Sequence, residues 1–344
     1  MMSGRRDFLA TATATAAAAV TGGAVCGAAD GAADVSPSPE SASPALWSRS
    51  VRLALNMSTL RGQQLTVPEQ VAVAAKAGYD GIEPWIRELR EFVEGGGSLR
   101  DLRRQIDDAG VRVESAIGFA AWIVDDDAAR RAGLEEARRD MALVAELGGT
   151  RIAAPPIGAH RPVDGQPPGP PLPVIAERYR RLLEVGAEAG VVPMLELWGF
   201  SPTLSTLSEL AYVAAGAGHP DACVLPDFYH IYKGGNDFAS LGVIEANRMP
   251  VFHINDYPAD PPLDTIADKD RVFPGDGVCP LAETIAMLLR HGFRGTFSLE
   301  LFNPVYWERD ASEVAREGLE KSRRVLDEAS RLVESGRPAE TGRS

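Results

Sequence analysis

The sequence is poor in cysteine, in clustered basic residues and in long apolar runs, and each shortage excludes a class of protein. It contains 3 cysteines in 344 residues, and Cys26 lies in a leader-like segment. Cys223 and Cys279 cannot form a framework of several disulfides, and their default interpretation is as small buried side chains. The formal net charge is −13 and no Lys/Arg-rich run offsets it, which argues against nucleic acid as a partner.

The first residues have the layout of an export signal. The pair Arg5-Arg6 precedes an Ala/Thr run that ends in small residues near Ala29, and this run is too weakly apolar for a membrane-spanning helix. The pattern predicts a twin-arginine leader and a periplasmic product with no stable membrane association after the leader is removed. The expected domains are the leader at 1–29, a flexible linker at 30–46, one folded domain at 47–336 and a frayed tail at 337–344.

Strand-like and helix-like segments alternate from Val51 onward. Short apolar runs predict strands at Val51–Leu55, Gly81–Trp85, Val111–Ile117, Arg151–Ile157, Val192–Leu197, Cys223–Phe228, Val251–Asp256 and Thr296–Phe302. Amphipathic periodicity predicts helices at Val67–Ala77, Leu99–Ala109, Ala128–Leu147, Val174–Ala189, Thr206–Ala217, Phe238–Ala246, Leu281–Arg290 and Ala311–Val333. This alternation predicts an α/β fold, a (β/α)8 TIM barrel. The alternative, a doubly wound open sheet, lacks its Gly-x-Gly-x-x-Gly turn after the first strand.

Polar residues stand at the ends of the last four predicted strands. They are Glu196 in MLELWGF, Asp227 in VLPDFYHIYKGG, His253 in VFHINDY and Glu300 in FSLELFNP. Any one of them could be a solvated helix cap or a hydrogen-bonded core residue. In a barrel, however, they would meet at the carboxyl ends of the strands, where three buried carboxylates need a cation. The sequence therefore predicts one divalent metal ion. The mostly oxygen ligand set favours manganese, with magnesium, cobalt or zinc as alternatives.

These motifs resemble the metal site of the sugar phosphate isomerase/epimerase family, the xylose isomerase-like TIM barrels. The resemblance covers about 51–333. It implies that Glu196, Asp227, His253 and Glu300 are the metal ligands. Glu196 and Glu300, on the fifth and eighth predicted strands, could approach a bound sugar from different sides and are therefore the predicted catalytic residues. The resemblance implies substrate-oxygen contacts for His230, three residues after Asp227, and for Arg271, which precedes the Pro274–Gly277 turn. Glu83, in GIEPW, stands where many members keep a glutamate, and we expect it to contact substrate.

Two tryptophans near strand ends, Trp122 and Trp198, suit stacking against a sugar ring, although packing in the core is the alternative for each. The sequence also departs from the family. The second glutamate that ketose epimerases carry shortly after the first ligand is missing from the segment after Glu196, Leu-Trp-Gly-Phe-Ser-Pro. Endonuclease IV-type enzymes, which assemble three metals with many histidines, are disfavoured because this chain has 5 histidines.

The expected chemistry starts with proton abstraction. A divalent ion can polarise a substrate carbonyl and an adjacent hydroxyl, and a carboxylate then removes the acidified carbon-bound proton to give an enediolate. We expect an isomerase or epimerase that acts on a carbohydrate or sugar-derived ketone. The alternative is a lyase or dehydratase acting on a keto-sugar, keto-glycoside or inosose. No cluster of basic residues offers a phosphate clamp, so the expected partner is an unphosphorylated small carbohydrate, and a homo-oligomer is compatible with the sequence.

Overall fold

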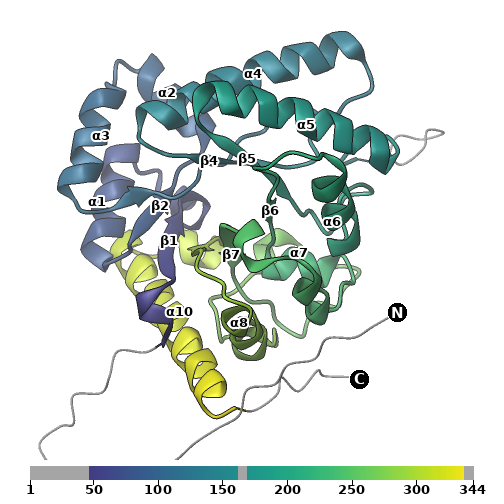
Figure 1. The fold of residues 1–344 in the computed structure, drawn as a ribbon. Coiled ribbons are helices and arrows are strands. Elements are labelled where there is room, and N and C mark those ends of the chain that lie inside the picture. Colours follow the sequence, from purple (N-terminus) through teal and green to yellow (C-terminus); the bar gives the residue numbers. More distant parts are fainter. Residues whose placement is uncertain (1–45, 162–168, 337–344) are drawn as a thin grey trace, which may run out of the picture. The chain divides into compact units, whose positions relative to one another are not determined.

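The computed structural model describes residues 46–161 and 169–336 (Figure 1). The leader predicted at 1–29, the linker at 30–46 except for Leu46, and the tail predicted at 337–344 lie outside the described residues. Those three expectations therefore stay predictions. Within the described ranges no helix combines the length and the apolar character that crossing a membrane requires.

The strands form the centre of the domain. They are β1 (Arg52–Asn56), β2 (Gly81–Glu83), β3 (Arg112–Val113), β4 (Arg151–Ala154), β5 (Val192–Glu196), β6 (Val224–Leu225), β7 (Val251–Ile254) and β8 (Thr296–Leu299). All pairings between them are parallel, in the orders β3-β2-β1-β8-β7 and β4-β5-β6. Backbone hydrogen bonds join the two arcs, from Ala153 N to Ala116 O (2.8 Å) and from His253 N to Pro226 O (2.9 Å). The strands therefore close into the predicted barrel.

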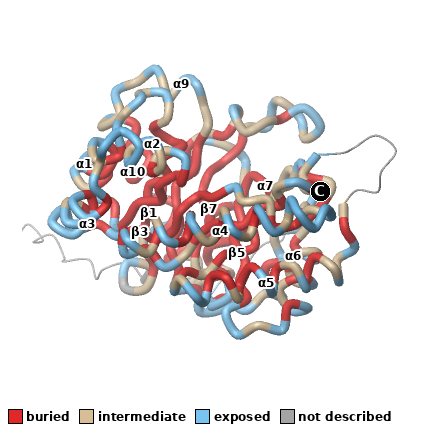
Figure 2. Tube along the Cα trace, turned by 90° about the horizontal axis from the view of Figure 1, so that it is seen from above, coloured by how far each residue is buried: buried red, intermediate tan, exposed pale blue. Residues whose placement is uncertain are grey.

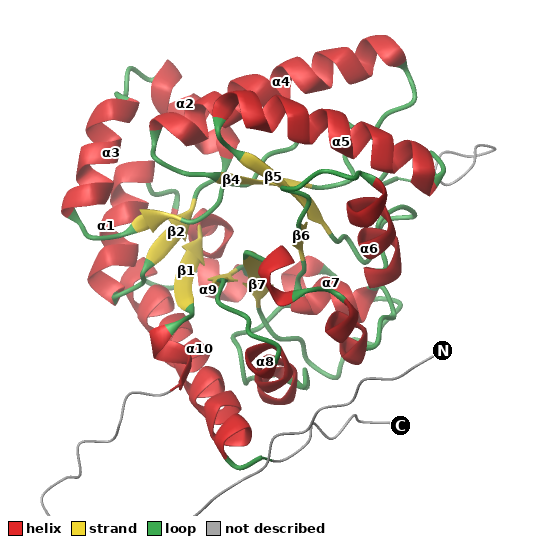
Figure 3. Cartoon of the chain, viewed as in Figure 1, coloured by secondary structure: helices red, strands yellow, loops and turns green. Residues whose placement is uncertain are grey.

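Helices surround the strands, as Figure 3 shows. The longer ones are α1 (Val67–Ala77), α2 (Ile86–Glu94), α3 (Leu99–Asp108), α4 (Asp127–Glu146), α5 (Leu172–Ala189), α6 (Leu207–Gly216), α8 (Leu281–Arg290) and α10 (Ala311–Glu334). Local sequence sets their ends. For example, Thr66 and Glu69 form a capping box at the start of α1, and Gly78 ends that helix at φ 92°, a left-handed conformation that glycine adopts without strain.

Short elements account for most differences from the predicted pattern. The helix predicted at Phe238–Ala246 is a 3-10 turn, η3 (Phe238–Val243), and a second one, η4, lies at Ala246–Arg248. The short helices α7 (Phe228–Lys233) and α9 (Pro304–Trp307), the longer α2, and the 3-10 segments η1 (Leu46–Arg49), η2 (Met57–Gln63) and η5 (Asp268–Asp270) were not predicted. The six-residue α7 and four-residue α9 are too short to show the periodicity that identifies longer helices in a sequence.

Burial follows the strands (Figure 2). Apart from the first residues of β1, β3, β4 and β5, every strand residue is buried, which is usual for a parallel sheet with helices packed over it. The core is largely apolar, although isolated polar side chains such as Glu114 and Asp140 are also buried, and a group of polar side chains lies at the carboxyl ends of the strands. Several buried polar side chains gather there, namely Asn56, Glu83, Glu196, Asp227, His253, Asn255, Asp256, Arg271 and Glu300. The fold thus collects ionisable groups at the end of the barrel where enzymes of this architecture work.

Candidate metal centre

The centre is built from the ends of neighbouring strands. Glu196 is the last residue of β5 and His253 lies within β7. Asp227 follows β6, caps the N-terminus of α7 and accepts a hydrogen bond from His230 N at 2.8 Å. Glu300 follows β8 directly. Asp227 therefore caps α7 with one carboxylate oxygen and belongs to the centre with the other, which accepts from other partners.

Three of the four predicted ligands offer one atom each within 4.8 Å of one another: Asp227, His253 and Glu300. His253 Nδ1 lies 3.3 Å from Glu300 Oε2 and 3.7 Å from Asp227 Oδ2. The fourth predicted ligand, Glu196, lies at the edge of this group, with Oε1 at 4.0 Å from the same nitrogen. His253 Nδ1 and Glu196 Oε2 have no hydrogen-bond partner among the residues described. Buried carboxylates around an unpartnered imidazole nitrogen fit a divalent cation.

Glu83 lies behind His253, not against the cavity. Its Oε2 accepts hydrogen bonds from His253 Nε2 (3.0 Å), Asn56 Nδ2 (2.8 Å) and Ser298 Oγ (2.7 Å). A carboxylate can only accept, so His253 donates through Nε2 and turns Nδ1 toward the predicted ligands. Metal-binding histidines usually have such a partner. Glu83 is therefore placed behind His253, where it can orient the imidazole, and not in the cavity lining where a substrate contact was expected.

His253 is buried among carboxylates. Burial lowers its pKa, but the charges of Glu300 and Glu83 outweigh that effect and hold the pKa well above the usual range. A protonated imidazole cannot bind a metal, so a cation that binds at Nδ1 must displace a proton. His253 and Arg271 in turn lower the pKa of Glu300 to about 2, against the opposing effect of its burial.

Arg271 neutralises part of the carboxylate charge. Its side chain is 1% exposed, and Nη1 donates to Asp227 Oδ2 and Glu300 Oε2, both at 2.9 Å. Nη2 donates to Asp268 Oδ1 (2.5 Å) and to His230 Nε2 (3.0 Å). Asn303 Nδ2 also fixes the backbone carbonyl of Arg271, at 2.9 Å. Protein carboxylates thus engage most of the guanidinium donors that were predicted to contact substrate oxygens, although Arg271 still lines the cavity.

His230 is a neutral imidazole with a defined tautomer. Burial, and secondly the charge of Arg271, lower its pKa to about 3. Nε2 accepts from Arg271, which has only donors, so the proton stands on Nδ1. That nitrogen has no partner within the described part of the chain, and the side chain lines the cavity. His230 can therefore donate a hydrogen bond to a ligand oxygen.

Glu196 is the carboxylate with the strongest tendency to bind a proton. Burial raises its pKa to about 8, with His253 opposing and Glu300 reinforcing the shift. Because Oε2 is not engaged by a donor of the described protein, this oxygen is free to accept a proton from a ligand. The two predicted catalytic glutamates therefore differ: Glu300 is held by Asn56 at Oε1 (3.1 Å) and by Arg271 at Oε2, whereas Glu196 is not anchored in this way.

A cavity of about 190 Å³ opens over these groups. It is lined by Trp85, Ile117, Phe119, Glu196, Trp198, Phe200, His230, Asp268, Arg271, Glu300 and Phe302. Trp198 is among them, as the stacking prediction requires. Trp122 is not: it is 1% exposed, donates from Nε1 to Pro155 O at 2.8 Å and packs beside Tyr179. The core-packing alternative for Trp122 therefore describes its position.

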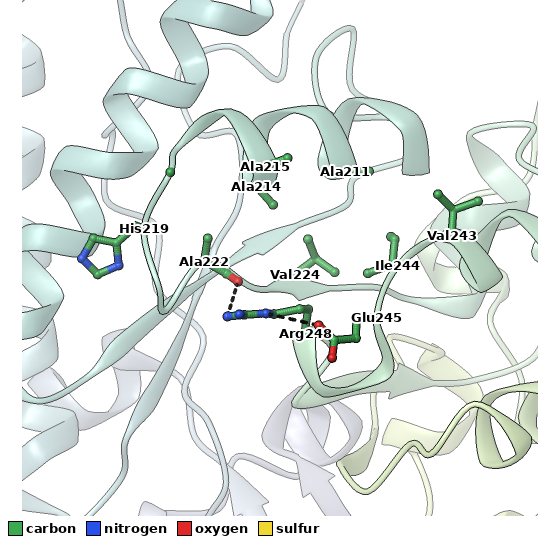
Figure 4. Close-up of a pocket in the computed structure, with 11 residues that line it drawn as sticks. Ala211, Ala214, Ala215, His219, Ala222, Val224, Val243, Ile244, Glu245 and Arg248 are labelled. Atoms are coloured by element: carbon green, nitrogen blue, oxygen red, sulfur yellow. Dashed lines mark hydrogen bonds and ion pairs between the residues drawn. The ribbon is translucent and has the colours of Figure 1, made fainter. Parts of the chain in front are cut away.

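A larger cavity, about 310 Å³, lies between α6 and the η3–η4 segment (Figure 4). Alanine and valine side chains make up much of its wall, and its one arginine, Arg248, contacts Ala222 O at 3.4 Å and Glu245 at 4.0 Å. The sequence-predicted site residues do not line it. Size alone would select this cavity, but its wall offers no comparable group of ligand atoms.

Sequence reasoning assigned no role to three supporting residues. Asn56 ends β1 and connects Glu83 to Glu300. Asn255 donates to Asp227 Oδ2 at 2.9 Å. Asp256 accepts from four backbone N–H groups, those of Tyr257, Gly275, Gly277 and Cys279, and so fixes the turn after Arg271. The signal that identified the ligands, a polar residue at the end of an apolar strand, was present for all three.

Comparisons with known proteins agree with this architecture. A family model described as xylose isomerase-like TIM barrel matches residues 71–325. The inosose isomerase of Bacillus velezensis is 24% identical over 278 residues, which are 80% of this chain and 97% of that protein. The 3-dehydroshikimate dehydratase of Pseudomonas putida is 27% identical over 274 residues, which are 78% of this chain but 41% of the dehydratase.

Solved structures share the fold. The crystal structure of IOLI protein with a binding zinc atom has a TM-score of 0.73 at 21% identity and covers 81% of this chain and 99% of its own. The structure of L-ribulose 3-epimerase has a TM-score of 0.67 at 18% identity and covers 85% and 100% of the two chains. The chain belongs to the xylose isomerase-like TIM barrel family.

Proposed function

We propose that this protein is a divalent-metal-dependent isomerase or epimerase that acts on a carbohydrate or sugar-derived ketone by proton abstraction. The observation that carries the proposal is the pairing of two unequal carboxylates over one cavity. Oε2 of Glu196 has no hydrogen-bond partner within the described residues, whereas both oxygens of Glu300 accept hydrogen bonds, from Asn56 and Arg271. Relatives named as isomerase, epimerase and dehydratase support an enzyme of this general kind.

Asp227, His253 and Glu300, with Glu196 at the edge of the group, would hold the metal. A bound divalent ion would supply Lewis acidity toward a substrate carbonyl and its neighbouring hydroxyl. Three carboxylates against one imidazole favour manganese, and the zinc named for a structural neighbour keeps zinc as an alternative.

The protein side chains divide the remaining work. Glu196 Oε2 is the proton acceptor for the carbon next to the carbonyl, because no donor of the described protein competes for it. Glu300 would help to hold the metal or would carry the returning proton. His230 Nδ1 donates to a substrate oxygen, and Arg271 holds His230 in the tautomer that makes this possible. Trp198 forms part of the apolar wall that excludes water.

A lyase is the second candidate, favoured by the match to a dehydratase. Both reactions begin with the same proton abstraction. They differ in the fate of the enolate, which is reprotonated by an isomerase but expels a leaving group beta to the carbonyl in a lyase. A keto-sugar, a keto-glycoside or an inosose would each be a suitable substrate for the second outcome.

Metal-loaded protein incubated in deuterated water with ketoses, keto-glycosides and inososes tests the proposal. Solvent deuterium on carbon, in a product isomeric with the substrate, indicates isomerisation or epimerisation, whereas loss of water or of an aglycone indicates a lyase. We expect Glu196→Gln to abolish incorporation while metal content stays near that of the wild type. Incorporation at the wild-type rate in Glu196→Gln would exclude Glu196 as the base.

We also propose export by the twin-arginine route, supported by Arg5-Arg6 and the run that follows them in the sequence. A carbohydrate from outside the cell would then reach the exported enzyme without crossing the cytoplasmic membrane. Fractionation of cells that express the full chain measures the location.

A further inference from the structure

Aromatic rings form a continuous series around the mouth of the cavity. Ring centroids are 6.0 Å apart for Phe302 and Trp85 and 5.2 Å apart for Trp85 and Phe119. The series continues from Phe119 to Trp198 at 6.3 Å and from Trp198 to Phe200 at 5.2 Å. All five rings line the same cavity as the two predicted catalytic glutamates. The site therefore has a polar, charged floor and an aromatic wall.

Two of these rings are partly exposed to water. Phe119 is 37% exposed and Phe200 is 44% exposed. Single exposed apolar residues are common on protein surfaces and need no explanation. These two differ because both line one cavity and each contacts the Trp198 ring, so a flat group placed against this row of rings would remove apolar surface from water.

The segment that carries Trp198 and Phe200 is held in a demanding conformation. A Cβ on Gly199 would lie 2.2 Å from His230 O and 2.5 Å from Gly234 N, so glycine alone lets this backbone lie against α7. Leu204, which is buried, has φ 57°, a left-handed conformation that leucine rarely adopts, and its carbonyl accepts from Trp198 N at 3.1 Å. Strain of this kind persists where the surrounding structure enforces it, often at ligand sites.

The floor and the mouth suit different chemical groups. The cavity of about 190 Å³ is smaller than the ~300–1,000 Å³ typical of ligand pockets, so a larger ligand must extend outward. His230 Nδ1 and the carboxylates of the floor suit hydroxyl and carbonyl oxygens. The residues that line the cavity include no lysine, and their one arginine, Arg271, already pairs with Asp227, Asp268 and Glu300. A second guanidinium, that of Arg61, lies 3.8 Å from the centroid of the Trp85 ring.

We propose that Phe119, Trp198 and Phe200 form a second subsite that binds a flat aromatic substituent of the substrate. This inference rests on the proposed function, in which the reacting sugar-derived ketone occupies the floor. It narrows the substrate class from free sugars to carbohydrates that carry an aryl group, such as an aryl glycoside oxidised to a ketone. The aryl group lies against this row of rings, and the carbohydrate reaches the glutamates of the same cavity.

Binding of two simple probes tests the subsite without requiring turnover. Titration calorimetry of the metal-loaded protein would give dissociation constants for phenyl β-D-glucopyranoside and methyl β-D-glucopyranoside. We expect the phenyl compound to bind on the order of tenfold more tightly, because an aromatic pair contributes roughly two- to tenfold in affinity beyond simple area burial. Phe200→Leu and Phe119→Leu, which keep apolar side chains but remove the rings, should each reduce this ratio by a similar factor.

Tyr212→Leu is the matched control. Tyr212 is 49% exposed on α6 and does not line the cavity, so its loss should leave the phenyl-to-methyl ratio unchanged. Failure of the phenyl compound to bind more tightly than the methyl compound, including the absence of binding by either, overturns the subsite. So does a ratio that survives both phenylalanine substitutions. If Phe119→Leu or Phe200→Leu changes the sedimentation coefficient but leaves the phenyl-to-methyl affinity ratio unchanged, the rings belong to a contact between copies of the chain and the subsite is wrong.

The outcome is separable from that of the proposed function. A wild-type protein that prefers the phenyl probe but incorporates no solvent deuterium into any ketone would contradict proton abstraction and leave the subsite standing. Deuterium incorporation without a preference for the phenyl probe would support proton abstraction and contradict the subsite.

Discussion

Replacing Glu83 by glutamine separates the role assigned by the structure from the role expected from the sequence. One oxygen of Glu83 accepts three hydrogen bonds, from His253, Asn56 and Ser298, at 2.7 to 3.0 Å. Glutamine keeps the size of the side chain but removes the charge that raises the basicity of His253. Its amide nitrogen also has no assured acceptor, because Glu83 Oε1 is buried without a partner in the described structure. We expect weaker metal binding together with a modest loss of stability.

The magnitude follows from the position of Glu83 behind a ligand. Loss of such a partner typically weakens metal affinity by about 10- to 100-fold, which corresponds to roughly 1.4–2.8 kcal/mol. Competition between the protein and a fluorescent chelator for Mn²⁺ or Zn²⁺ measures this change. A residue that touched substrate instead would raise the Michaelis constant and leave metal affinity unaltered.

Glu114→Gln is the control for this experiment. Glu114 is also buried in the barrel, but it accepts from Arg52 Nη2 (2.9 Å) and Thr296 Oγ1 (2.8 Å) at the opposite ends of the strands. We expect it to lower stability without changing metal affinity. If Glu83→Gln binds metal as tightly as the wild type does, the orienting role of Glu83 is wrong.

Three further predictions concern packing and export. Gly199→Ala should lower the free energy of unfolding by at least about 1–3 kcal/mol, measured by urea denaturation, because the new methyl group would meet two backbone atoms at 2.2 and 2.5 Å. Trp122→Phe should cost about 1–3 kcal/mol through the loss of a donor to a buried carbonyl, yet leave the Michaelis constant unchanged; a raised constant with normal stability would restore Trp122 as a substrate contact. Replacing Arg5 and Arg6 by lysine should retain the protein in the cytoplasm, and unimpaired export of that variant would rule out the twin-arginine route.

The alternation of apolar runs and amphipathic segments was sufficient to predict the barrel. It also located the polar residues at the strand ends, because Glu196, Asp227, His253 and Glu300 each follow or end a run that can only be buried. The same local signal could not tell a residue that faces the cavity from one that lies behind it. Whether Glu83 points at a ligand or at His253 depends on Asn56 and Ser298, which are supplied by other strands.

Side chains on long connections were harder to predict. Trp122 stands shortly after a predicted strand, but the chain returns it to the core beside Tyr179. Arg271 was recognised through the turn that follows it. Two of its carboxylate partners follow β6 and β8 and the third lies in the 3-10 segment before it, so pairing with three carboxylates was not visible locally. The short helix α7 went unnoticed although it carries His230.

The central claim is that the carboxyl ends of β5 to β8 hold one divalent ion. Equilibrium dialysis against Mn²⁺ or Zn²⁺, followed by elemental analysis, tests it most directly. The account predicts one ion per chain in the wild type and in Trp122→Phe, and near-complete loss of the ion in Asp227→Ala and in His253→Ala. Wild-type metal content in both of the latter variants would contradict it.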